Sequence, residues 1–391
     1  MNERKRLRVL FVTNWFPDAD NPCRGVFVKE HAHAAALYNK VTVLFLSLKD
    51  GLTAGWSGIS RGVEDDIETI RFTQRKHRFP KIGFLRDLSG QVKFVRKLIS
   101  DDRPDVIHAH TYGSGLPAVI VGKRNRIPVA VTEHWSGFTE ERLPRFEGFK
   151  ARYALNHAQI VLPVSGYLKR RIEKHGIEKR LRVVPNAIDC RLFSPSPRRG
   201  GRTGGISRFL LVALLTPVKG IPYLLQAVRA LKVKRGGGFR LDIVGDGPNR
   251  AEYERLAAEL DIDDLVTWHG TLSKPNIAQL MHRCDFFVLP SLSETFGCAL
   301  AEAMACGLPF VATETGAVPE VADPRGGILV PPGDSRALEE AIGVMMERHR
   351  EYSPEVIAST VCDRFSRETV GRMLDEVYRG LVHRSADSRN H

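Results

Sequence analysis

Two acidic residues in the second half of the chain are spaced so that they could hold a polar ligand together. Glu294 and Glu302 lie in the segment PSLSETFGCALAEAMACGLPFVATETG at residues 290–316. An apolar strand-like run precedes Glu294, and a helix is predicted to begin near Gly297, so Glu294 falls in a strand-to-helix loop. A carboxylate there can accept hydrogen bonds from sugar hydroxyls, while the N–H groups of the helix start favour phosphate oxygens. The pattern therefore suits a nucleotide sugar, although an isolated pair of this kind is more often a helix cap and a surface charge.

The first half of the chain alternates between apolar strands and helical segments. Six strand-like runs are RVLFVTN (8–14), VTVLFLS (41–47), DVIHAH (105–110), VAVTEH (129–134), IVLPVS (160–165) and RVVPN (182–186). Helices are predicted between them, for example at residues 25–38, 114–123 and 167–175. Apolar strands separated by helices predict a parallel sheet that is covered on both faces, with ligands beyond the carboxyl ends of its strands.

A segment rich in Ser, Pro and Gly, SPSPRRGGRTGGIS at residues 194–207, interrupts this periodicity and predicts an interdomain linker. A second alternation follows it. Its strand-like runs are residues 209–215, 239–246, 266–270, 286–291, 309–314 and 327–332. The fold class expected is therefore α/β, with two Rossmann-like doubly wound domains facing each other across a cleft, an arrangement that suits a reaction with two substrates.

The 290–316 segment resembles the E-x7-E segment of retaining glycosyltransferases of family four, which have the GT-B fold. Supporting strings occur in the order that this family uses, namely VVPNAID (183–189), VKG (218–220), VGDGPNR (244–250), VTWHGTL (266–272) and GAVPEV (316–321). The resemblance covers nearly the whole chain. It implies an N-terminal acceptor-binding domain (1–195), a C-terminal nucleotide-sugar-binding domain (205–365) and a C-terminal helix, about 366–385, that packs back on the first domain.

The resemblance also implies which residues bind the donor. Glu294 should hold the hydroxyls of the donor sugar, and Glu302 should hold the ribose of the nucleotide. The remaining donor contacts are expected from Gly245 and from Phe296, Gly297, Cys298 and Ala299. The implied reaction moves a hexose from a nucleoside diphosphate sugar with retention of configuration, without a metal ion or a cofactor. The leaving phosphate itself would help to deprotonate the acceptor, so that catalysis is mainly electrostatic.

Lys219 is the expected catalytic cation of the second domain. It follows the first strand there, where a compact ammonium charge can reach the diphosphate, although a helix-start lysine can also be a surface residue. Family members often carry an Arg five residues before this lysine, but Ala213 and Leu214 stand where Gly and Arg would be. One diphosphate-binding cation is therefore missing, and Arg24, beside Gly25 in the first domain, is a candidate replacement.

Four residues of the first domain complete the expected site. Gly25 stands at the entry of the first helix, where the family places glycines next to the donor phosphates, though a turn alone can require a glycine. His134, in TEHWSGF, matches a family histidine that contacts the donor sugar. It is expected to be catalytic together with Lys219 and Glu294. His110 and Tyr112, in HAHTYGSG, are candidates for the acceptor side or for structural roles. His108 and His110 share a strand face, but no carboxylate cluster completes a ligand set, so no metal site is expected.

The charge of the chain is unevenly distributed. The net charge is +13, yet residues 1–200 carry 36 Lys and Arg against 20 Asp and Glu, whereas the remainder carries 22 against 25. A basic half can face nucleic acid, anionic lipid or a polyanionic substrate.

The stretch RKHRFPKIGFLRDLSGQVKFVRKLI (75–99) mixes basic and apolar residues at helical spacing. An interfacial helix shows this pattern, and so does a helix docked on its own sheet. The partners expected are the nucleotide-sugar donor, a glycan or lipid-linked acceptor and an anionic membrane surface, with no nucleic acid.

Two further features concern location. No apolar run approaches the roughly 20 residues of a membrane-spanning helix, and the first residues lack the apolar core of a secretory signal. We therefore expect a cytoplasmic protein that associates peripherally with the inner face of the cell membrane.

The six cysteines show no CxxC spacing and are expected to be reduced thiols. Asp18-Ala19-Asp20 spells DxD, but its Pro-flanked position predicts a turn.

Four other functions are weaker. A nucleotide-sugar epimerase or a phosphorylase could share the fold, but no segment argues for the lysine-bound pyridoxal phosphate that a phosphorylase needs. A noncatalytic polyanion-binding protein would explain the basic half but not the E-x7-E segment. A dehydrogenase is disfavoured because NWFPD follows the first strand in place of GxGxxG. The strings FPDADNPCRGVFVKEH and TEHWSGF look most like enzymes of bacterial surface-polysaccharide assembly.

Overall fold

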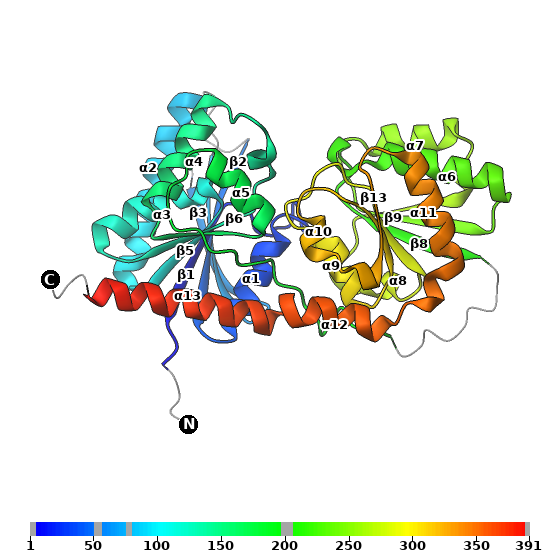
Figure 1. Ribbon diagram of the computed structural model, residues 1–391. Helices are drawn as coiled ribbons and strands as arrows, with labels where there is room; N and C mark the ends of the chain where they lie inside the picture. Colours follow the sequence, from blue (N-terminus) through cyan, green and yellow to red (C-terminus); the bar gives the residue numbers. More distant parts are fainter. Residues whose placement is uncertain (1–4, 51–56, 76–79, 197–205, 388–391) are drawn as a thin grey trace. The chain divides into compact units, whose positions relative to one another are not determined.

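The computed structural model describes residues 5–50, 57–75, 80–196 and 206–387, and they form two compact units (Figure 1). Unit 1 contains the described residues up to Ala187 together with those from Arg367 onward, and unit 2 runs from Ile188 to Ser366. The chain therefore crosses between the units at 187–188 and again at 366–367. The linker predicted at 194–207 lies after the first crossing, and its residues 197–205 are outside the described part.

The described residues of unit 1 contain a seven-stranded sheet in the order β3-β4-β2-β1-β5-β6-β7. Its strands are β1 (Arg8–Thr13), β2 (Lys40–Lys49), β3 (Ser57–Glu64), β4 (Ile67–Arg75), β5 (Val106–His110), β6 (Val129–Glu133) and β7 (Ile160–Pro163). All neighbouring strands are parallel except the β3–β4 pair. Apolar residues dominate β1, β5, β6 and β7 because helices cover both faces of these strands.

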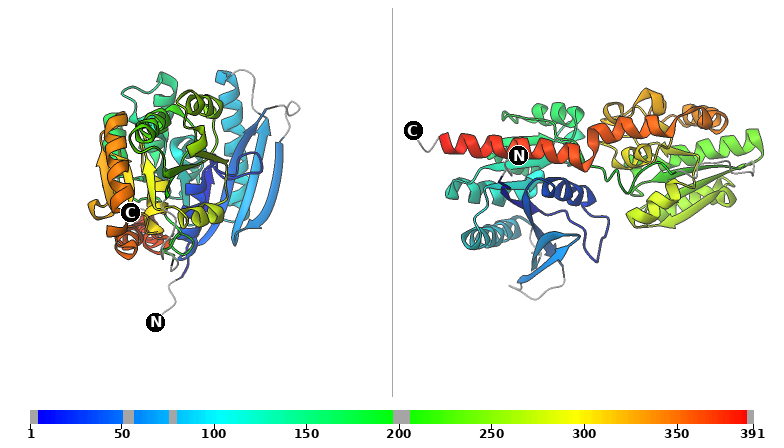
Figure 2. Two further views of the ribbon diagram at one scale, coloured as in Figure 1. Left: turned by 90° about the vertical axis from the view of Figure 1, so that its right-hand side faces the viewer. Right: turned by 90° about the horizontal axis from the view of Figure 1, so that it is seen from below.

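The sequence-based strand assignment for unit 1 is wrong in two places. The β3–β4 hairpin, drawn in light blue at the edge of the sheet in Figure 2, was not predicted. Its turn consists of Asp65 and Asp66, both with positive φ (45° and 65°). A pair that contains Gly is the usual sequence signal for such a hairpin, and it is missing here. The run predicted at 182–186 is not a strand, although it is joined to β7. The N–H groups of Arg182 and Val184 donate to Val161 O and Pro163 O, each at 3.1 Å, beside an isolated bridge between Val161 and Leu181.

Helices cover both faces of the unit 1 sheet. They are α1 (Val26–Ala36), α2 (Pro80–Asp101), α3 (Thr111–Asn125), α4 (Arg145–His157), α5 (Gly166–Lys174) and α13 (Arg367–Asp387), with the short 3-10 helix η1 (Ser136–Thr139). The C-terminal helix α13 packs against α1, and both bury apolar side chains in one core with the strands. Their backbones approach closely at Gly371, where an added Cβ would lie 2.2 Å from the carbonyl oxygen of Ala34. The last helix of the chain is thus part of the first unit.

Unit 2 contains, within its described residues, a six-stranded parallel sheet in the order β10-β9-β8-β11-β12-β13. Its strands are β8 (Ser207–Val212), β9 (Phe239–Val244), β10 (Val266–Gly270), β11 (Phe286–Leu289), β12 (Phe310–Thr313) and β13 (Gly327–Val330). They fall within the runs that the sequence predicted, apart from the extension of β8 to Ser207. The order reverses at β8, as it does at β1 in unit 1, so both sheets are doubly wound.

The helices of unit 2 form two layers. They are α6 (Ile221–Arg235), α7 (Arg250–Glu259), α8 (Lys274–Met281), α9 (Cys298–Ala305), α10 (Val318–Val321), α11 (Ser335–Arg348) and α12 (Pro354–Phe365), with 3-10 helices η2 (Pro217–Lys219), η3 (Asp263–Leu265), η4 (Pro324–Gly326) and η5 (His349–Glu351). Residues of α6, α7 and α11 share a core with the strands, while α9 and α12 pack together.

The expectation that every cysteine is reduced is wrong for one pair, because Cys190 and Cys362 form a disulfide in this structure. The two residues are 172 positions apart, so no local spacing could announce the bond. Near it, the backbone N–H of Ile188 donates to the carbonyl oxygen of Phe365 at 2.8 Å. The segments by which the chain enters and leaves unit 2 are therefore joined to each other.

Candidate active site

The residues predicted for catalysis in unit 2 lie at the point where the strand order of its sheet reverses. Strand β8 lies between β9 and β11, so the connections that leave β8 and β11 start side by side and lead to helices on different faces. Lys219 lies in the connection after β8, and Glu294 lies in the connection after β11. Open α/β sheets bind their ligands outside the carboxyl ends of the strands at such a point.

Lys219 and Glu294 form an ion pair, with Lys219 Nζ 2.6 Å from Glu294 Oε1. The same carboxylate oxygen accepts a hydrogen bond from Ser291 Oγ at 2.8 Å. Glu294 is 8% exposed and Ser291 is fully buried. The structure thus brings together two residues that are 75 positions apart in the sequence, and the hydroxyl and the ammonium together fix the direction of the carboxylate.

Backbone contacts hold the loops that carry this pair. Leu292 N donates to Val218 O at 2.8 Å, which joins the two loops directly. Gly220 has a φ of 63°, and a Cβ there would lie 2.0 Å from the carbonyl oxygen of Pro290. At Gly316 a Cβ would lie 2.1 Å from Glu294 O, which also accepts the N–H of Ala317 at 2.9 Å. Glu294 is therefore positioned through its backbone as well as its side chain.

Helix α9 begins at Cys298, four residues after Glu294, and presents backbone donors. Gly297, with a φ of 93°, precedes the helix, and Cys298 and Ala299 are its first two residues. The N–H groups of a first helical turn point along the helix axis and can bind an anion. The side chain of Phe296 is buried and packs edge-on against Phe365, with ring centroids 5.2 Å apart, so this residue can offer a ligand only its backbone.

Glu302 lies one turn further along α9 and is 7% exposed. Its carboxylate pairs with Lys274 Nζ of α8 at 3.0 Å. A carboxylate oxygen is a hydrogen-bond acceptor, so this side chain could bind the hydroxyls of a ribose. Glu294 and Glu302 thus each have a lysine partner, from a different element in each case.

Gly245 has a packing role in this structure. Its φ is 129°, and a Cβ there would lie 1.8 Å from the carbonyl oxygen of Ala213, so only glycine lets the loop after β9 approach the loop after β8. Leu214, which stands where the family often has Arg, is 60% exposed. Leu214 therefore supplies no positive charge for a diphosphate.

In unit 1, His134 follows β6 and belongs to a cluster of buried histidines. Its Nε2 lies 3.1 Å from Nδ1 of His110 at the end of β5, and its ring lies 4.4 Å from the ring of Phe27. His108 contacts Tyr378 OH and Thr132 Oγ1, each at 2.7 Å, and His31 Nε2 contacts Pro185 O at 3.0 Å. His31 was not predicted from the sequence.

Burial keeps these histidines neutral. It lowers the pKa of His31 to about 4, and it lowers the pKa of His108, His110 and His134 well below the usual value. Ring nitrogens of His31, His110 and His134 lie within 4.8 Å of one another, the proximity that metal ligation requires. In this structure His110 Nδ1 and His134 Nε2 lie at hydrogen-bond distance from each other. The absence of a metal from the site stays a prediction.

Tyr112 lies at the start of α3, and its hydroxyl donates to Glu147 Oε2 of α4. Lys150 pairs with the other oxygen of Glu147 at 2.6 Å. Burial, together with the hydrogen bond to Glu147, raises the pKa of Tyr112 well above its usual value. The backbone N–H of Tyr112 donates to Glu133 Oε2 at 2.9 Å.

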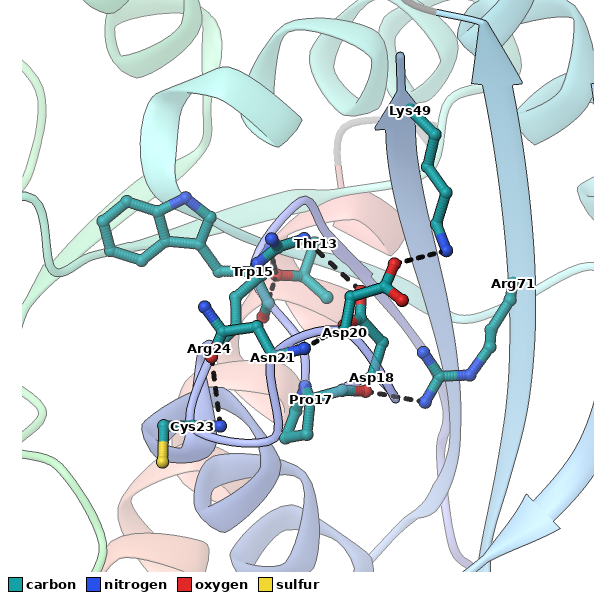
Figure 3. A network of polar contacts seen from close by, with 10 residues as sticks. All are labelled: Thr13, Trp15, Pro17, Asp18, Asp20, Asn21, Cys23, Arg24, Lys49 and Arg71. Atoms are coloured by element: carbon teal, nitrogen blue, oxygen red, sulfur yellow. Dashed lines mark hydrogen bonds and ion pairs between the residues drawn. The ribbon is translucent and has the colours of Figure 1, made fainter. Parts of the chain in front are cut away.

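Figure 3 shows the loop between β1 and α1, which ends at Gly25. Asn21 N donates to Asp18 Oδ1 at 2.8 Å, so the DxD string forms the predicted turn. Asp20 pairs with Lys49 at 2.7 Å, and Arg24, the candidate replacement cation, lies 3.4 Å from Asp18 Oδ2.

Gly25 itself has a φ of 61°, and a Cβ there would lie 2.3 Å from the carbonyl oxygen of Trp15. Arg71 Nη2 donates to Pro17 O at 2.8 Å and holds the same loop from β4. The glycine is therefore required by close packing within this loop. Its contact with donor phosphates stays a prediction.

Sequence reasoning missed several residues that this arrangement brings to the site. Ser291 stands three residues before Glu294 in the segment already singled out, and a search for donors near that carboxylate could have found it. Glu133 directly precedes His134 in the TEHWSGF string. For Lys274 and His31 the sequence holds no signal, because their contacts depend on how separate elements pack.

Comparison with known proteins identifies the family. A family model described as Glycosyl transferases group 1 matches residues 199–354, and one described as Glycosyltransferase Family 4 matches residues 30–192. The chain belongs to the family four glycosyltransferases. The resemblance stated from the sequence is thereby confirmed.

Individual relatives of this glycosyltransferase are distant. A D-inositol 3-phosphate glycosyltransferase from Pseudarthrobacter chlorophenolicus is 27% identical over 63% of this chain and 64% of its own length. An MMP alpha-(1->4)-mannosyltransferase from Mycolicibacterium hassiacum is 37% identical over 44% of this chain and 41% of its own length. A putative colanic acid biosynthesis glycosyltransferase from Escherichia coli K12 is 26% identical over 80% of this chain and 81% of its own length. The match therefore spans less than two thirds of the first two relatives.

Solved structures confirm the fold class. Sucrose-phosphate synthase from Thermosynechococcus elongatus superposes with a TM-score of 0.77 at 21% identity, covering 96% of this chain and 99% of that one. Anabaena HepE, solved in complex with UDP and glucose, gives a TM-score of 0.73 at 21% identity, with 96% and 100% covered. The glycosyltransferase thus has the GT-B architecture of two Rossmann-like domains, as predicted. None of its described helices has the length and apolar character needed to cross a membrane.

Proposed function

We propose that this chain is a retaining, metal-independent hexosyltransferase that moves a sugar from a nucleoside diphosphate sugar to a lipid-linked glycan acceptor. The observation that carries the proposal is the Lys219–Glu294 pair at the strand-order reversal of unit 2, shortly before the N-terminus of α9. A cation, a carboxylate and the N–H groups of a helix start are the three kinds of group that a sugar diphosphate needs. The proposed process is surface-polysaccharide biosynthesis, which the name of the relative from Escherichia coli supports.

Each group in unit 2 has a proposed task. Lys219 moves from Glu294 to the diphosphate and stabilises the negative charge that grows on it as the bond to the sugar breaks. Glu294, released from the lysine, accepts hydrogen bonds from the sugar hydroxyls. The N–H groups of Gly297, Cys298 and Ala299 bind sugar or diphosphate oxygens, and Glu302 binds the ribose. No cofactor is required, because the donor already carries its leaving group.

In unit 1, His134 is proposed to contact the donor sugar, and His110 and Tyr112 to lie on the acceptor side. His134 is neutral because burial lowers its pKa, so it can donate one hydrogen bond and accept another. Deprotonation of the acceptor hydroxyl falls to the leaving phosphate, on the same face of the sugar, which gives retention.

An anionic membrane surface is the proposed location of the acceptor, and unit 1 offers a surface that suits it. Phe146, Phe149 and Tyr153 follow one face of α4, at a spacing of three and four residues, and all three are exposed. Phe84 of α2 packs against Phe146, with ring centroids 5.1 Å apart, and Leu85 beside it is 68% exposed.

Basic residues accompany this aromatic surface. Lys150 lies 4.8 Å from the ring centre of Phe146, and Arg75 and Arg86 lie on β4 and α2. Lys76, Arg78 and Phe79, which were also predicted to face the membrane, are outside the described residues. Exposed aromatic side chains combined with basic residues favour peripheral binding to anionic lipid at the cytoplasmic face.

The donor is to be identified by a panel of UDP-, GDP- and ADP-sugars. Thermal shift first finds the nucleotide that stabilises the protein, since a ligand at 100 times its dissociation constant adds about 2.7 kcal/mol. Release of the nucleoside diphosphate in the presence of a lipid-linked glycan then measures transfer, and NMR of the product reports the anomeric configuration. An inverted product, or the absence of transfer with every donor, would refute the proposal.

A further inference from the structure

A carboxylate with no exposed surface lies beside the proposed site in unit 1. Glu133 is the last residue of β6 and is completely buried. Its Oε1 accepts the backbone N–H groups of His134 at 3.0 Å and Trp135 at 2.9 Å. Its Oε2 accepts the N–H of Tyr112 at 2.9 Å, across from β6 to the start of α3. Among the described residues no cation pairs with it.

We propose that Glu133 is a positioning residue, whose carboxylate ties the chain after β5 to the chain after β6 and so fixes Tyr112 and His134 relative to each other. The functional consequence rests on the proposed function, in which these two residues meet the substrates. Glu133 itself is too deeply buried to touch either substrate.

Only an ionised carboxylate satisfies all three N–H groups. Both of its oxygens are acceptors and neither carries a hydrogen. A glutamine would turn an NH2 group toward one of the N–H donors, and a protonated carboxyl would direct a hydroxyl there. In either case at least one of the two segments loses a hydrogen bond.

Ionisation of Glu133 destabilises the folded protein. Burial raises the pKa of Glu133 to about 7, although the three backbone hydrogen bonds lower it again in part. A carboxyl whose pKa is raised on folding contributes most stability below its unfolded pKa, near 4.5, and loses that contribution as the pH rises through about 7. Ionisation of Glu133 therefore lowers the free energy of unfolding. The ionised carboxylate nevertheless accepts more backbone hydrogen bonds than the protonated carboxyl would.

The backbone beside Tyr112 is also strained. Thr111 has a φ of 68°, which is rare for a β-branched residue, and its hydroxyl donates to Asn14 Oδ1 at 3.0 Å. Such a conformation persists only where neighbouring contacts hold it. Asn14 on one side and Glu133, through Tyr112 N, on the other supply these contacts.

The histidines and the tyrosine that face Glu133 have pKa values shifted away from neutral pH. The facing histidines His108 and His110 of β5, His31 of α1 and the adjacent His134 all have pKa values lowered by burial. The pKa of Tyr112 is raised. Beyond Tyr112, hydrogen bonds from Lys150 and Tyr112 outweigh burial and lower the pKa of Glu147 on α4.

The test compares Glu133→Gln with the wild type and with Asp375→Asn in the full chain. Asp375 is a second buried carboxylate of unit 1, bonded to Arg379 on α13, and serves as the matched control. Hydrogen exchange at pH 8 is measured in peptides covering residues 110–114 and 132–136. We expect exchange at least 10-fold faster in Glu133→Gln and unchanged exchange in the control. Unchanged exchange in Glu133→Gln would overturn the proposal.

Kinetics with the donor found by the panel provide the second readout. The wild type and the control should lose kcat/KM as the pH falls below about 7, whereas Glu133→Gln should be at least 10-fold less active at pH 8 and lack this acid limb. An acid limb that persists in Glu133→Gln would also overturn the proposal. If the wild type transfers no sugar, the proposed function fails, and the exchange experiment still decides the role of Glu133. If Glu133→Gln does not fold, Glu133→Asp replaces it, because it keeps both acceptors but withdraws them by one methylene.

Discussion

Removing the ammonium of Lys219 is the most direct test of the unit 2 site. In the structure this group lies 2.6 Å from Glu294 Oε1, and the side chain of Lys219 is 23% exposed. A unit cation about 4 Å from a phosphate charge gains about 4 kcal/mol at an effective dielectric constant of about 20. Part of this gain replaces the existing contact with Glu294. We therefore expect Lys219→Ala to lose about 2.7 kcal/mol of transition-state stabilisation, or about 100-fold in donor turnover.

The control is Lys232→Ala. Lys232 lies on α6 of the same unit, its side chain is also 23% exposed, and it pairs with Asp261 and Asp264. Both variants remove a lysine from an ion pair, but only one of these lysines adjoins Glu294. The assay is nucleoside diphosphate release at saturating acceptor, with circular dichroism and thermal unfolding to confirm that each variant is folded.

Glu294→Ala completes the experiment and should also lower turnover by about 100-fold or more. Because Lys219 and Glu294 contact each other and are assigned to the same donor, the double variant should lose less than the sum of the two single effects. Rates near that of the wild type in both folded single variants would refute the site assignment. A comparable loss in Lys232→Ala would show that the effect is not specific to the site.

Three further outcomes are expected. Glu302→Ala should raise the KM for the donor about 10-fold with little change in kcat, because a ribose contact is made equally in the ground and transition states, and a pure kcat defect would contradict that role. Activity should be complete in excess EDTA, and a strict divalent-ion requirement would overturn the metal-free mechanism. Liposome sedimentation should show binding that rises with anionic lipid and falls with salt. Phe149→Ser should weaken this binding whereas Val233→Ser, at a comparably exposed position of unit 2, should not, and indifference to lipid charge would refute the membrane proposal.

Periodicity predicted most of the fold because most strands here are buried on both faces. Runs such as FFVL in β11 and VIHAH in β5 are apolar or buried at every position, so they differ clearly from the helices between them. The β3–β4 hairpin lacks this signal. Its strand SGISRGVE lies at the sheet edge, and its turn uses two aspartates with positive φ.

The candidate site was predictable one residue at a time but not as a set. Lys219 and Glu294 could each be placed after a strand, yet their contact depends on β8 and β11 being neighbours, which the order of strands along the chain does not state. The same limit applies to Cys190 and Cys362, since a bond across 172 residues depends on the tertiary fold. Glu133 was in view within TEHWSGF, but its three hydrogen bonds depend on β5 and β6 pairing in one register.

The ion pair between Lys219 and Glu294 also limits how the donor can bind. Each group satisfies the charge of the other, with Ser291 as a further donor to the carboxylate. In the proposed function the donor exchanges one contact for two, lysine to phosphate and carboxylate to hydroxyl, and the broken pair offsets part of the affinity gained. In return, the contact between the two side chains and the hydrogen bond from Ser291 already order the carboxylate before the donor binds. Binding is weaker than the separate contacts would suggest, but little reorganisation is left for the chemical step.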